Sequence, residues 1–254
     1  LAPLALLLIA GSLVMLWFVI LSGLTRTSPL RQTYFLRADT SGIEGARPVS
    51  QWTYFRVCGD DNDDCGPSRP ALPLGDAWDS NADGVPSDLI GGYGGDTTSH
   101  YYWYMWRFGW VFFLLALFFE VVAFFAGFLA LCSRLGSALT GLIALIAWIF
   151  LTIAVSLMTA TFVNMRNVFR RDDRDASLGR YAFGFSWGAW AALLLSTMLF
   201  CLARHKRRDT TTNTSTTNGT ADGTGVQGAA PRRRWDRPWR RNTHSGRRVK
   251  GEYA

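Results

Sequence analysis

Residues 52–66 read WTYFRVCGDDNDDCG, an aromatic run that ends in Cys58, followed by an acidic turn and a second cysteine, Cys65. The stretch belongs to a long polar segment that lies between hydrophobic blocks and is long enough to form a folded domain. A turn of Gly, Asp and Asn allows the two cysteines to close a small disulfide loop, which persists only in an oxidising compartment. The stretch therefore indicates which side of a membrane this segment faces.

Hydrophobic residues make up 49% of the 254 residues, and they gather into blocks that are apolar on all sides. A soluble domain would place its apolar residues on one face of each helix or strand, so a lipid environment explains the blocks better. About 20 such residues span a bilayer core as a helix. We expect four transmembrane helices, at residues 1–21, 107–132, 139–163 and 181–203.

The first block has a second interpretation, a secretory signal peptide. Its apolar run is longer than the usual signal core and no clear cleavage site follows it, so a membrane span is favoured. The sequence begins with Leu1 rather than Met, which we interpret as a truncated or processed start.

Four polar segments connect or follow the spans. They are a first loop at residues 22–106, a short cytoplasmic link at 133–138, a second loop at 164–180 and a C-terminal tail at 204–254. The link is so short that the second and third spans should be antiparallel neighbours. The tail begins with a polar segment of low complexity that cannot bury enough apolar area to fold, so we expect it to be disordered.

Charge assigns a side to each segment. The first loop carries six arginines against eleven acidic residues, whereas the tail carries thirteen Lys and Arg against four acidic residues. Because basic residues near span ends favour the cytoplasm, we expect the tail inside and both loops outside. The second loop disagrees, since it carries five arginines against three aspartates, but the basic cluster that adjoins the last span outweighs it.

Several stretches occur in an order that is typical of one family. They are residues 34–43 (YFLRADTSGI), 52–55 (WTYF) with Cys58, 130–137 (ALCSRLGS), 156–160 (SLMTA) and 176–179 (ASLG). Together they resemble the fungal eisosome tetraspans, the Sur-seven/PalI family. The resemblance covers nearly the whole chain up to Cys201, is looser across residues 60–98 and is absent from the tail.

That family is claudin-like, so the resemblance implies a Trp and Cys-pair motif in the first loop, here Trp52, Cys58 and Cys65. The Gly-Leu-Trp of claudins is missing before Cys58, where residues 55–57 are FRV, and this argues against a tight-junction function. The resemblance also implies a small antiparallel sheet. Alternation in residues 51–58 is consistent with one strand that holds Trp52 and Tyr54 on the same face, with Trp52 in a packing role.

The expected fold is therefore an all-α membrane protein, a claudin-like bundle of four transmembrane helices with a small extracellular β-sheet in the first loop and a disordered basic tail. The resemblance implies a fungal plasma-membrane protein of the furrow-like eisosome compartment, linked with cell-wall integrity, endocytosis and lipid homeostasis. Implied partners are sphingolipids, sterol, eisosome proteins, a cell-wall polymer and further copies of the chain in a homo-oligomer or lattice. The PalI branch instead assists ambient-pH sensing, but residues 38–43 (ADTSGI) favour the eisosome branch.

Glu120 lies near the middle of the second span, where a carboxylate is expensive and should face the bundle. It could be the proton or ion site of a transporter or channel. A helix–helix hydrogen bond with Ser12, Thr152, Ser156 or Ser196 is favoured, because a conduction pathway needs a chain of polar groups.

The four cysteines fall into two classes. Cys58 and Cys65 lie in the first loop, where an oxidising compartment favours a disulfide over two free thiols. Cys132 and Cys201 lie at the expected cytoplasmic ends of spans. They are candidates for S-palmitoylation, and buried free thiols are an equal alternative.

Residues 79–84 (DSNADG) match the opening of a calcium-binding loop, with oxygen ligands at Asp79, Asn81 and Asp83. The closing Glu is missing, because Ile90 stands at its position. A solvated acidic turn is therefore favoured, and we expect no metal.

The basic residues of the tail point to lipid. Each basic residue near an anionic leaflet contributes roughly 1 kcal/mol, so inner-leaflet lipids, including phosphoinositides, are favoured as partners over RNA and over plain solvation. The tail also holds two glycosylation sequons, at Asn213 and Asn218, which a cytoplasmic tail would leave unmodified. The expected headgroup-binding residues are Arg204, Lys206, Arg207, Arg208, Arg232, Arg233, Arg234, Arg240 and Arg241.

Catalytic patterns are missing from the sequence. It has three histidines, no set of nucleophile, base and acid, and no Gly-rich phosphate loop. We expect no enzymatic activity, no cofactor and no nucleic-acid partner. The favoured function is a structural tetraspan that organises a membrane domain. The alternatives are an accessory protein of a pH or wall-stress sensor, and a transporter or channel that uses Glu120.

Overall fold

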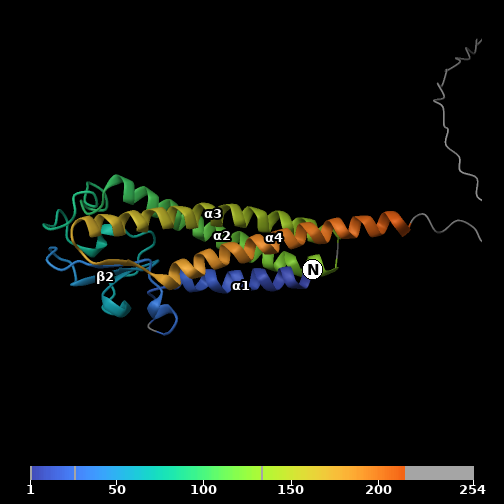
Figure 1. Ribbon diagram of the computed structural model, residues 1–254, viewed down its shortest axis with the longest axis horizontal. Helices are drawn as coiled ribbons and strands as arrows, with labels where there is room; N and C mark the ends of the chain where they lie inside the picture. The colour runs from blue at the N-terminus through green and yellow to red at the C-terminus, as the bar shows by residue number, and fades with distance from the viewer. Residues whose placement is uncertain (1, 26, 133, 215–254) are drawn as a thin grey trace, which may run out of the picture. The chain divides into compact units, whose positions relative to one another are not determined.

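A computed structural model describes residues 2–25, 27–132 and 134–214, except for the side chains of residues 2, 130–135 and 203–214. Four long helices run side by side (Figure 1): α1 (Ala2–Ile20), α2 (His100–Cys132), α3 (Arg134–Arg171) and α4 (Arg180–Thr214). Each contains a stretch that is long and apolar enough to cross a membrane. The expected four-helix membrane fold is confirmed.

The helices extend beyond the expected spans. Helix α2 begins at His100 rather than at residue 107, and α4 continues past residue 203 to Thr214. Hydropathy marks where lipid ends, whereas a helix continues until its hydrogen bonding is interrupted, so the two bounds need not coincide.

Helix α3 shows the largest departure from the expected bounds. It fills Arg134–Arg171, so residues 134–138 of the expected link and residues 164–171 of the expected loop at 164–180 are helical. Within its last turns Met165, Val168 and Phe169 are buried at helical spacing, which is the period that keeps one face against a core.

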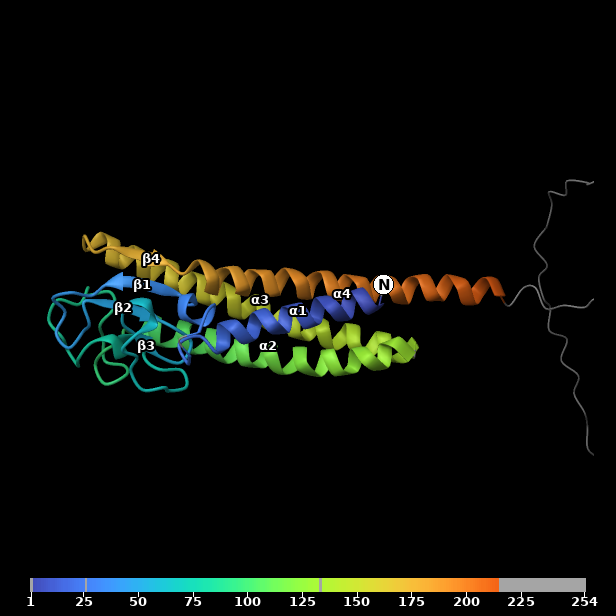
Figure 2. The ribbon, with the colours of Figure 1, turned by 90° about the horizontal axis from the view of Figure 1, so that it is seen from below.

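A small antiparallel sheet lies at one end of the bundle (Figure 2). Its strands are β1 (Leu36–Asp39), β2 (Val49–Trp52), β3 (Val57–Cys58) and β4 (Ala176–Leu178), in the order β3-β2-β1-β4. Three short 3-10 helices accompany it: η1 (Leu30–Gln32), η2 (Asp60–Asn62) and η3 (Leu74–Ala77). We call residues 22–99 together with 172–179 the head.

The small antiparallel sheet is present as expected, but it differs from the expectation in two details. Residues 51–58 form a hairpin rather than one strand, because the chain turns where the Thr53 N–H donates to the Arg56 carbonyl at 3.0 Å. The sheet also takes its fourth strand from the second loop, since β4 pairs with β1. That approach requires Gly179, where a Cβ would collide with the Tyr34 carbonyl.

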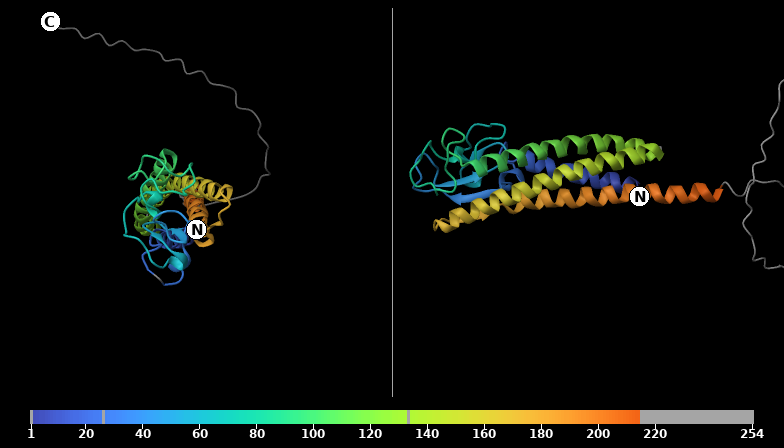
Figure 3. Two further views of the ribbon diagram at one scale, coloured as in Figure 1. Left: turned by 90° about the vertical axis from the view of Figure 1, so that its left-hand side faces the viewer. Right: turned by 90° about the horizontal axis from the view of Figure 1, so that it is seen from above.

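Phe35 joins the head to the bundle. Its ring stacks on Phe162 of α3 at a centroid distance of 5.0 Å. It also makes T-shaped contacts with Trp106 of α2 and Phe183 of α4. Figure 3 shows the sheet seated against the helix ends, which is consistent with these contacts. The buried residues of the head and those of the bundle therefore form one continuous core.

Candidate functional site

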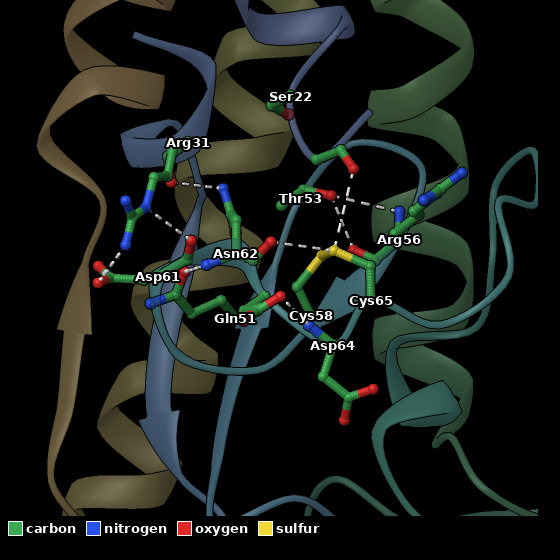
Figure 4. The surroundings of a disulfide bond; sticks show 12 residues. Ser22, Arg31, Gln51, Thr53, Arg56, Cys58, Asp61, Asn62, Asp64 and Cys65 are labelled. Carbon is green, nitrogen blue, oxygen red and sulfur yellow. Dashed lines mark hydrogen bonds and ion pairs between the residues drawn. A yellow bond between two sulfur atoms is a disulfide. The ribbon is translucent and has the colours of Figure 1, made fainter. Parts of the chain in front are cut away.

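A disulfide joins Cys58 at the end of β3 to Cys65 beyond the acidic turn (Figure 4). Within that turn Asp61, Asn62 and Asp64 have φ values of +58°, +55° and +44°. Asp and Asn adopt the left-handed region more readily than other residues with a side chain, because their short polar groups can hydrogen-bond locally. The acidic composition of the turn thus has a conformational cause.

Asn62 is the buried centre of the disulfide loop. Its Nδ2 donates to the Arg31 carbonyl at 2.8 Å and to the Leu30 carbonyl at 3.3 Å, and its backbone N–H donates to Gln51 Oε1 at 3.2 Å. The loop is thereby tied to η1 and to β2. Sequence reasoning missed this residue, although it is the one amide among four aspartates.

Trp52 is 1% exposed and fills the space between the sheet and its neighbours. Its indole N–H donates to the Leu74 carbonyl at 2.8 Å. Its ring lies 6.3 Å from that of Trp78 and 5.9 Å from that of Phe169, near the end of α3. The motif tryptophan is therefore held by one directional bond and by aromatic contacts, which is a packing role.

Tyr54 connects the head to two helices. Its hydroxyl donates to the Trp110 carbonyl of α2 at 2.7 Å, and the Trp110 indole N–H donates back to the Tyr54 carbonyl at 3.2 Å. The two rings stack at 5.4 Å. The Tyr54 backbone N–H donates to Ser22 Oγ, just after α1. Burial raises the pKa of Tyr54 well above its usual value, because the ionised form would lose its hydration.

Arginines neutralise much of the acidic turn. Arg37 holds Asp60 through contacts of 2.9 and 3.3 Å, and Arg31 holds Asp61 at 2.8 Å. The hydrogen bond from Arg37 lowers the pKa of Asp60 and raises the pKa of Arg37. The negative charge counted in the sequence is therefore partly cancelled on the surface of the head.

Glu120 of α2 is fully buried in the bundle, and neither of its carboxylate oxygens has a hydrogen-bond partner among the described residues. Ser12 of α1 lies close to it, but the Ser12 hydroxyl donates to the Ala189 carbonyl of α4 at 3.0 Å. Ser12 and Glu120 therefore lie close enough to interact, but the favoured helix–helix hydrogen bond does not reach hydrogen-bonding geometry. The other three expected partners do not bond to it either: Thr152, Ser156 and Ser196.

Comparison with known proteins identifies the family. A model of the SUR7/PalI family matches residues 1–199. The chain belongs to the SUR7/PalI family. Protein SUR7 of Candida albicans is 36% identical over 195 residues, which cover 75% of this chain and 69% of that protein. Protein SUR7 of Saccharomyces cerevisiae is 31% identical over 202 residues, which cover 78% and 64%.

A further relative carries information on location. The Saccharomyces cerevisiae protein described as uncharacterized plasma membrane protein YNL194C is 27% identical over 209 residues, which cover 78% of this chain and 67% of that protein. The chain spans about two thirds of the length of these SUR7 relatives. Together with the four spans, these matches describe a membrane protein of the SUR7/PalI family.

The palmitoylation, calcium and headgroup-binding residues predicted for this SUR7/PalI family member do not form a site among the described residues. Cys201 is a free, exposed cysteine on α4. Among the described residues no group of three or more His, Cys, Asp or Glu could hold a metal; Asp79 instead accepts the Ala82 N–H through its backbone carbonyl. The side chains of Cys132 and of Arg204–Arg208, and all of the tail arginines from Arg232 on, lie outside the description.

Proposed function

We propose that this protein is a structural, oligomerising tetraspan of the fungal plasma membrane that organises the eisosome-associated, furrow-like compartment. Its contributions to cell-wall integrity, endocytosis and lipid homeostasis would follow from that organisation. The observation that carries the proposal is the match to the SUR7/PalI family over residues 1–199. The relative described as a plasma membrane protein supports the location.

The geometry of the described residues suits a structural element. Between 28% and 39% of the residues in each span are buried, so most residues of every span keep some exposed surface. The outward surface of α2 carries large rings, since Phe118, Phe125 and Phe128 are 48–64% exposed. Such surfaces are available to lipid and to neighbouring copies, while the head holds the ends of the four helices in one arrangement.

Orientation is part of the proposal, with the head outside the cell and the tail inside. The disulfide supports it, because such bonds persist in oxidising compartments, and so does the basic cluster after the fourth span. A sequon test is decisive. The substitution Asp83→Thr creates an acceptor at the exposed Asn81 of the head, whereas the native sequons at Asn213 and Asn218 lie in the tail.

Expressed in a secretory yeast system, the Asp83→Thr chain should carry an N-glycan that endoglycosidase removes, and the unaltered chain should carry none. A glycan on the unaltered chain at Asn213 or Asn218 would reverse the orientation. Both chains should reach the plasma membrane in equal amounts, which checks that the substitution does not affect folding.

The organising function is tested by imaging. A fluorescently tagged chain in live fungal cells should form stable surface patches whose fluorescence recovers slowly after bleaching. A diffuse rim with rapid recovery would contradict the proposal. Deletion that disperses the patches of other compartment proteins supports an organiser, whereas deletion that abolishes a pH or wall-stress response with patches intact supports the sensor alternative.

A further inference from the structure

A cleft of about 380 Å³, with charged side chains in its lining, opens where the sheet meets the start of α4. Its lining comes from η1, β1, β2, η2, β4 and the first turn of α4. Three parts of the chain that are distant in sequence therefore contribute to it, residues 31–37, 51–61 and 177–181. The residues that matter chemically are Arg31, Tyr34, Arg37, Asp61, Arg180 and Tyr181. At the left of Figure 4, Arg31 and Asp61 lie beside the brown ribbon, which is β4 and the start of α4.

The cleft lies at the level where the spans begin. The apolar stretch of α4 starts at Arg180 and that of α1 ends at Ile20. Near these two helix ends the rings of Phe18 and Phe185 lie 5.3 Å apart. Tyr and Arg at a span end are typical of the headgroup layer of a bilayer. The cleft therefore opens toward lipid headgroups in the leaflet on the head side.

The acids of the cleft are already paired. Asp60 accepts two contacts from Arg37 as well as one from Gln51 at 3.2 Å, and Asp61 is held by Arg31. Arg180 is exposed and makes no hydrogen bond or ion pair with any described residue. The positive end of the α4 macrodipole lies at the same position. The cleft thus offers one unpaired guanidinium to an anion.

Further donors surround that guanidinium. The hydroxyls of Tyr34 and Tyr181 line the cleft and make no hydrogen bond among the described residues. Directly below, Gly184 is exposed and a Cβ built on it would meet nothing within 4 Å. This leaves a notch on the outer face of α4 between the exposed rings of Tyr181 and Trp187, along which an acyl chain can lie.

We propose that this cleft binds the phosphate of a phospholipid in the leaflet on the head side. Arg180 supplies the charge, the tyrosine hydroxyls supply hydrogen bonds, and the notch at Gly184 receives the start of an acyl chain. Guanidinium groups match phosphate geometry well. This site lies at the start of α4, whereas the basic residues expected to bind lipid follow its apolar stretch in the sequence. It would therefore be a lipid contact separate from theirs.

The test uses the full chain in detergent micelles and phosphatidate that carries a photoactivatable group beside the phosphate. Cross-linked peptides are mapped by mass spectrometry, and binding is titrated for the unaltered chain and for Arg180→Gln, Asp61→Asn and Arg171→Gln. Arg171→Gln is the matched control, because Arg171 is an exposed arginine at the head end of α3 outside this cleft. Cross-links to the tail appear in separate peptides.

We expect cross-links in peptides that contain Tyr34 or Tyr181. Arg180→Gln should weaken this binding about fivefold, the effect of one basic residue near phosphate, and Arg171→Gln should leave it unchanged. Asp61→Asn should strengthen it about fivefold, because Arg31 then loses its partner and faces the phosphate. The opposite signs separate binding from damage to the fold.

Two results would overturn the proposal. The first is equal binding by the Arg180→Gln and Arg171→Gln chains, or cross-links confined to other peptides. The second concerns the source of the phosphate: inorganic phosphate that binds the cleft as tightly as phosphatidate rules out the lipid assignment. Phosphatidate that binds at least about tenfold tighter than inorganic phosphate, with no binding of neutral diacylglycerol, supports it.

Discussion

The head and the helix bundle treat buried polar groups differently. In the head, the Tyr54 hydroxyl and the Trp52 indole each donate to a backbone carbonyl, and a disulfide closes the adjacent loop. In the bundle, Glu120 is just as buried and neither carboxylate oxygen is bonded. The bundle does contain interhelical hydrogen bonds, from Ser12 to the Ala189 carbonyl and from Ser196 to the Ala5 carbonyl. The difference is therefore one of degree: directional bonds tie the head together, whereas the bundle also relies on the fit of its surfaces.

The fit in the bundle depends on small residues. At Gly127 of α2 a Cβ would approach Leu6 of α1, and at Gly188 of α4 it would lie 2.9 Å from the Met15 sulfur. Lipid tails are as apolar as the helices, so helices in a membrane associate through such close packing rather than through exclusion of water. Substitutions that remove bonds should therefore be more damaging in the head than in the bundle.

The largest effect is expected from Trp52→Ala. Loss of a fully buried aromatic side chain costs about 3–5 kcal/mol of unfolding free energy, and here the Leu74 carbonyl also loses its donor. The measurement is unfolding of the purified chain in mixed micelles by a denaturing detergent. Trp187→Ala is the matched control, because that ring is 42% exposed on α4, and it should change the free energy by about 0.5 kcal/mol or less.

Removal of the disulfide should rank second. The double substitution Cys58→Ser with Cys65→Ser frees a short loop, which lowers the free energy of unfolding by about 2–3 kcal/mol. Cys201→Ser is the control, since that thiol is free and exposed. If both chains unfold at the same detergent fraction as the unaltered protein, then the loop is held by Asn62 and the arginine pairs rather than by the disulfide.

The sequence predicted those features that depend on composition over a long stretch or on one pair of cysteines. Four apolar blocks were enough to place the spans, because bilayer thickness sets their length. The fourth strand, Ala176–Leu178, was missed because three residues carry no pattern of their own and pair only once β1 is in place. The extension of α3 could have been found, since Met165, Val168 and Phe169 keep helical spacing past the apolar block.

The candidate sites divide in the same way. The disulfide follows from the compartment, and the structure contains it. Asn62 was missed, because what it contacts depends on how η1 and β2 approach the turn. The cleft at Arg180 could not be predicted from the sequence at all, since three separate parts of the chain line it and its charge depends on which acids are already paired.

A smaller effect is expected from Tyr54→Phe. The substitution keeps the ring but removes the hydroxyl that donates to the Trp110 carbonyl, and a hydrogen bond of this kind contributes about 0.5–1.5 kcal/mol. Tyr101→Phe is the control, because Tyr101 is 43% exposed. If Tyr101→Phe lowers the free energy of unfolding more than Tyr54→Phe does, the Tyr54 hydroxyl does not stabilise the contact between head and bundle.

The same residue predicts a dependence on pH. Burial raises the pKa of Tyr54 above its usual value, so the folded protein keeps the hydroxyl neutral while the unfolded chain ionises near pH 10. The stabilising contribution is then fully present below about pH 10 and is lost as the pH rises toward the pKa of the folded protein. The difference in unfolding free energy between the unaltered and Tyr54→Phe chains should therefore stay constant up to about pH 9 and shrink as the pH rises above about 10.

The smallest effect should come from Glu120→Gln. Because neither carboxylate oxygen reaches hydrogen-bonding geometry, replacement by an amide of the same shape exchanges one unbonded polar group for another and should change the unfolding free energy by less than about 0.5 kcal/mol. Ser196→Ala is the comparison within the same bundle. It removes a buried hydrogen bond of 2.9 Å to the Ala5 carbonyl. Hydrogen bonds between membrane helices contribute about 0.6 kcal/mol to stability on average.

The losses of unfolding free energy in Glu120→Gln and Ser196→Ala, compared with each other, test the role of Glu120. A loss for Glu120→Gln well above that for Ser196→Ala would show that the carboxyl group has a bonded partner in the membrane, and the contrast between head and bundle would disappear. Ion or proton flux through reconstituted vesicles that depends on Glu120 would instead favour the transporter alternative. Unchanged stability and no such flux leave Glu120 as a polar group that the tight fit around Ser12 and the small residues of α2 tolerates.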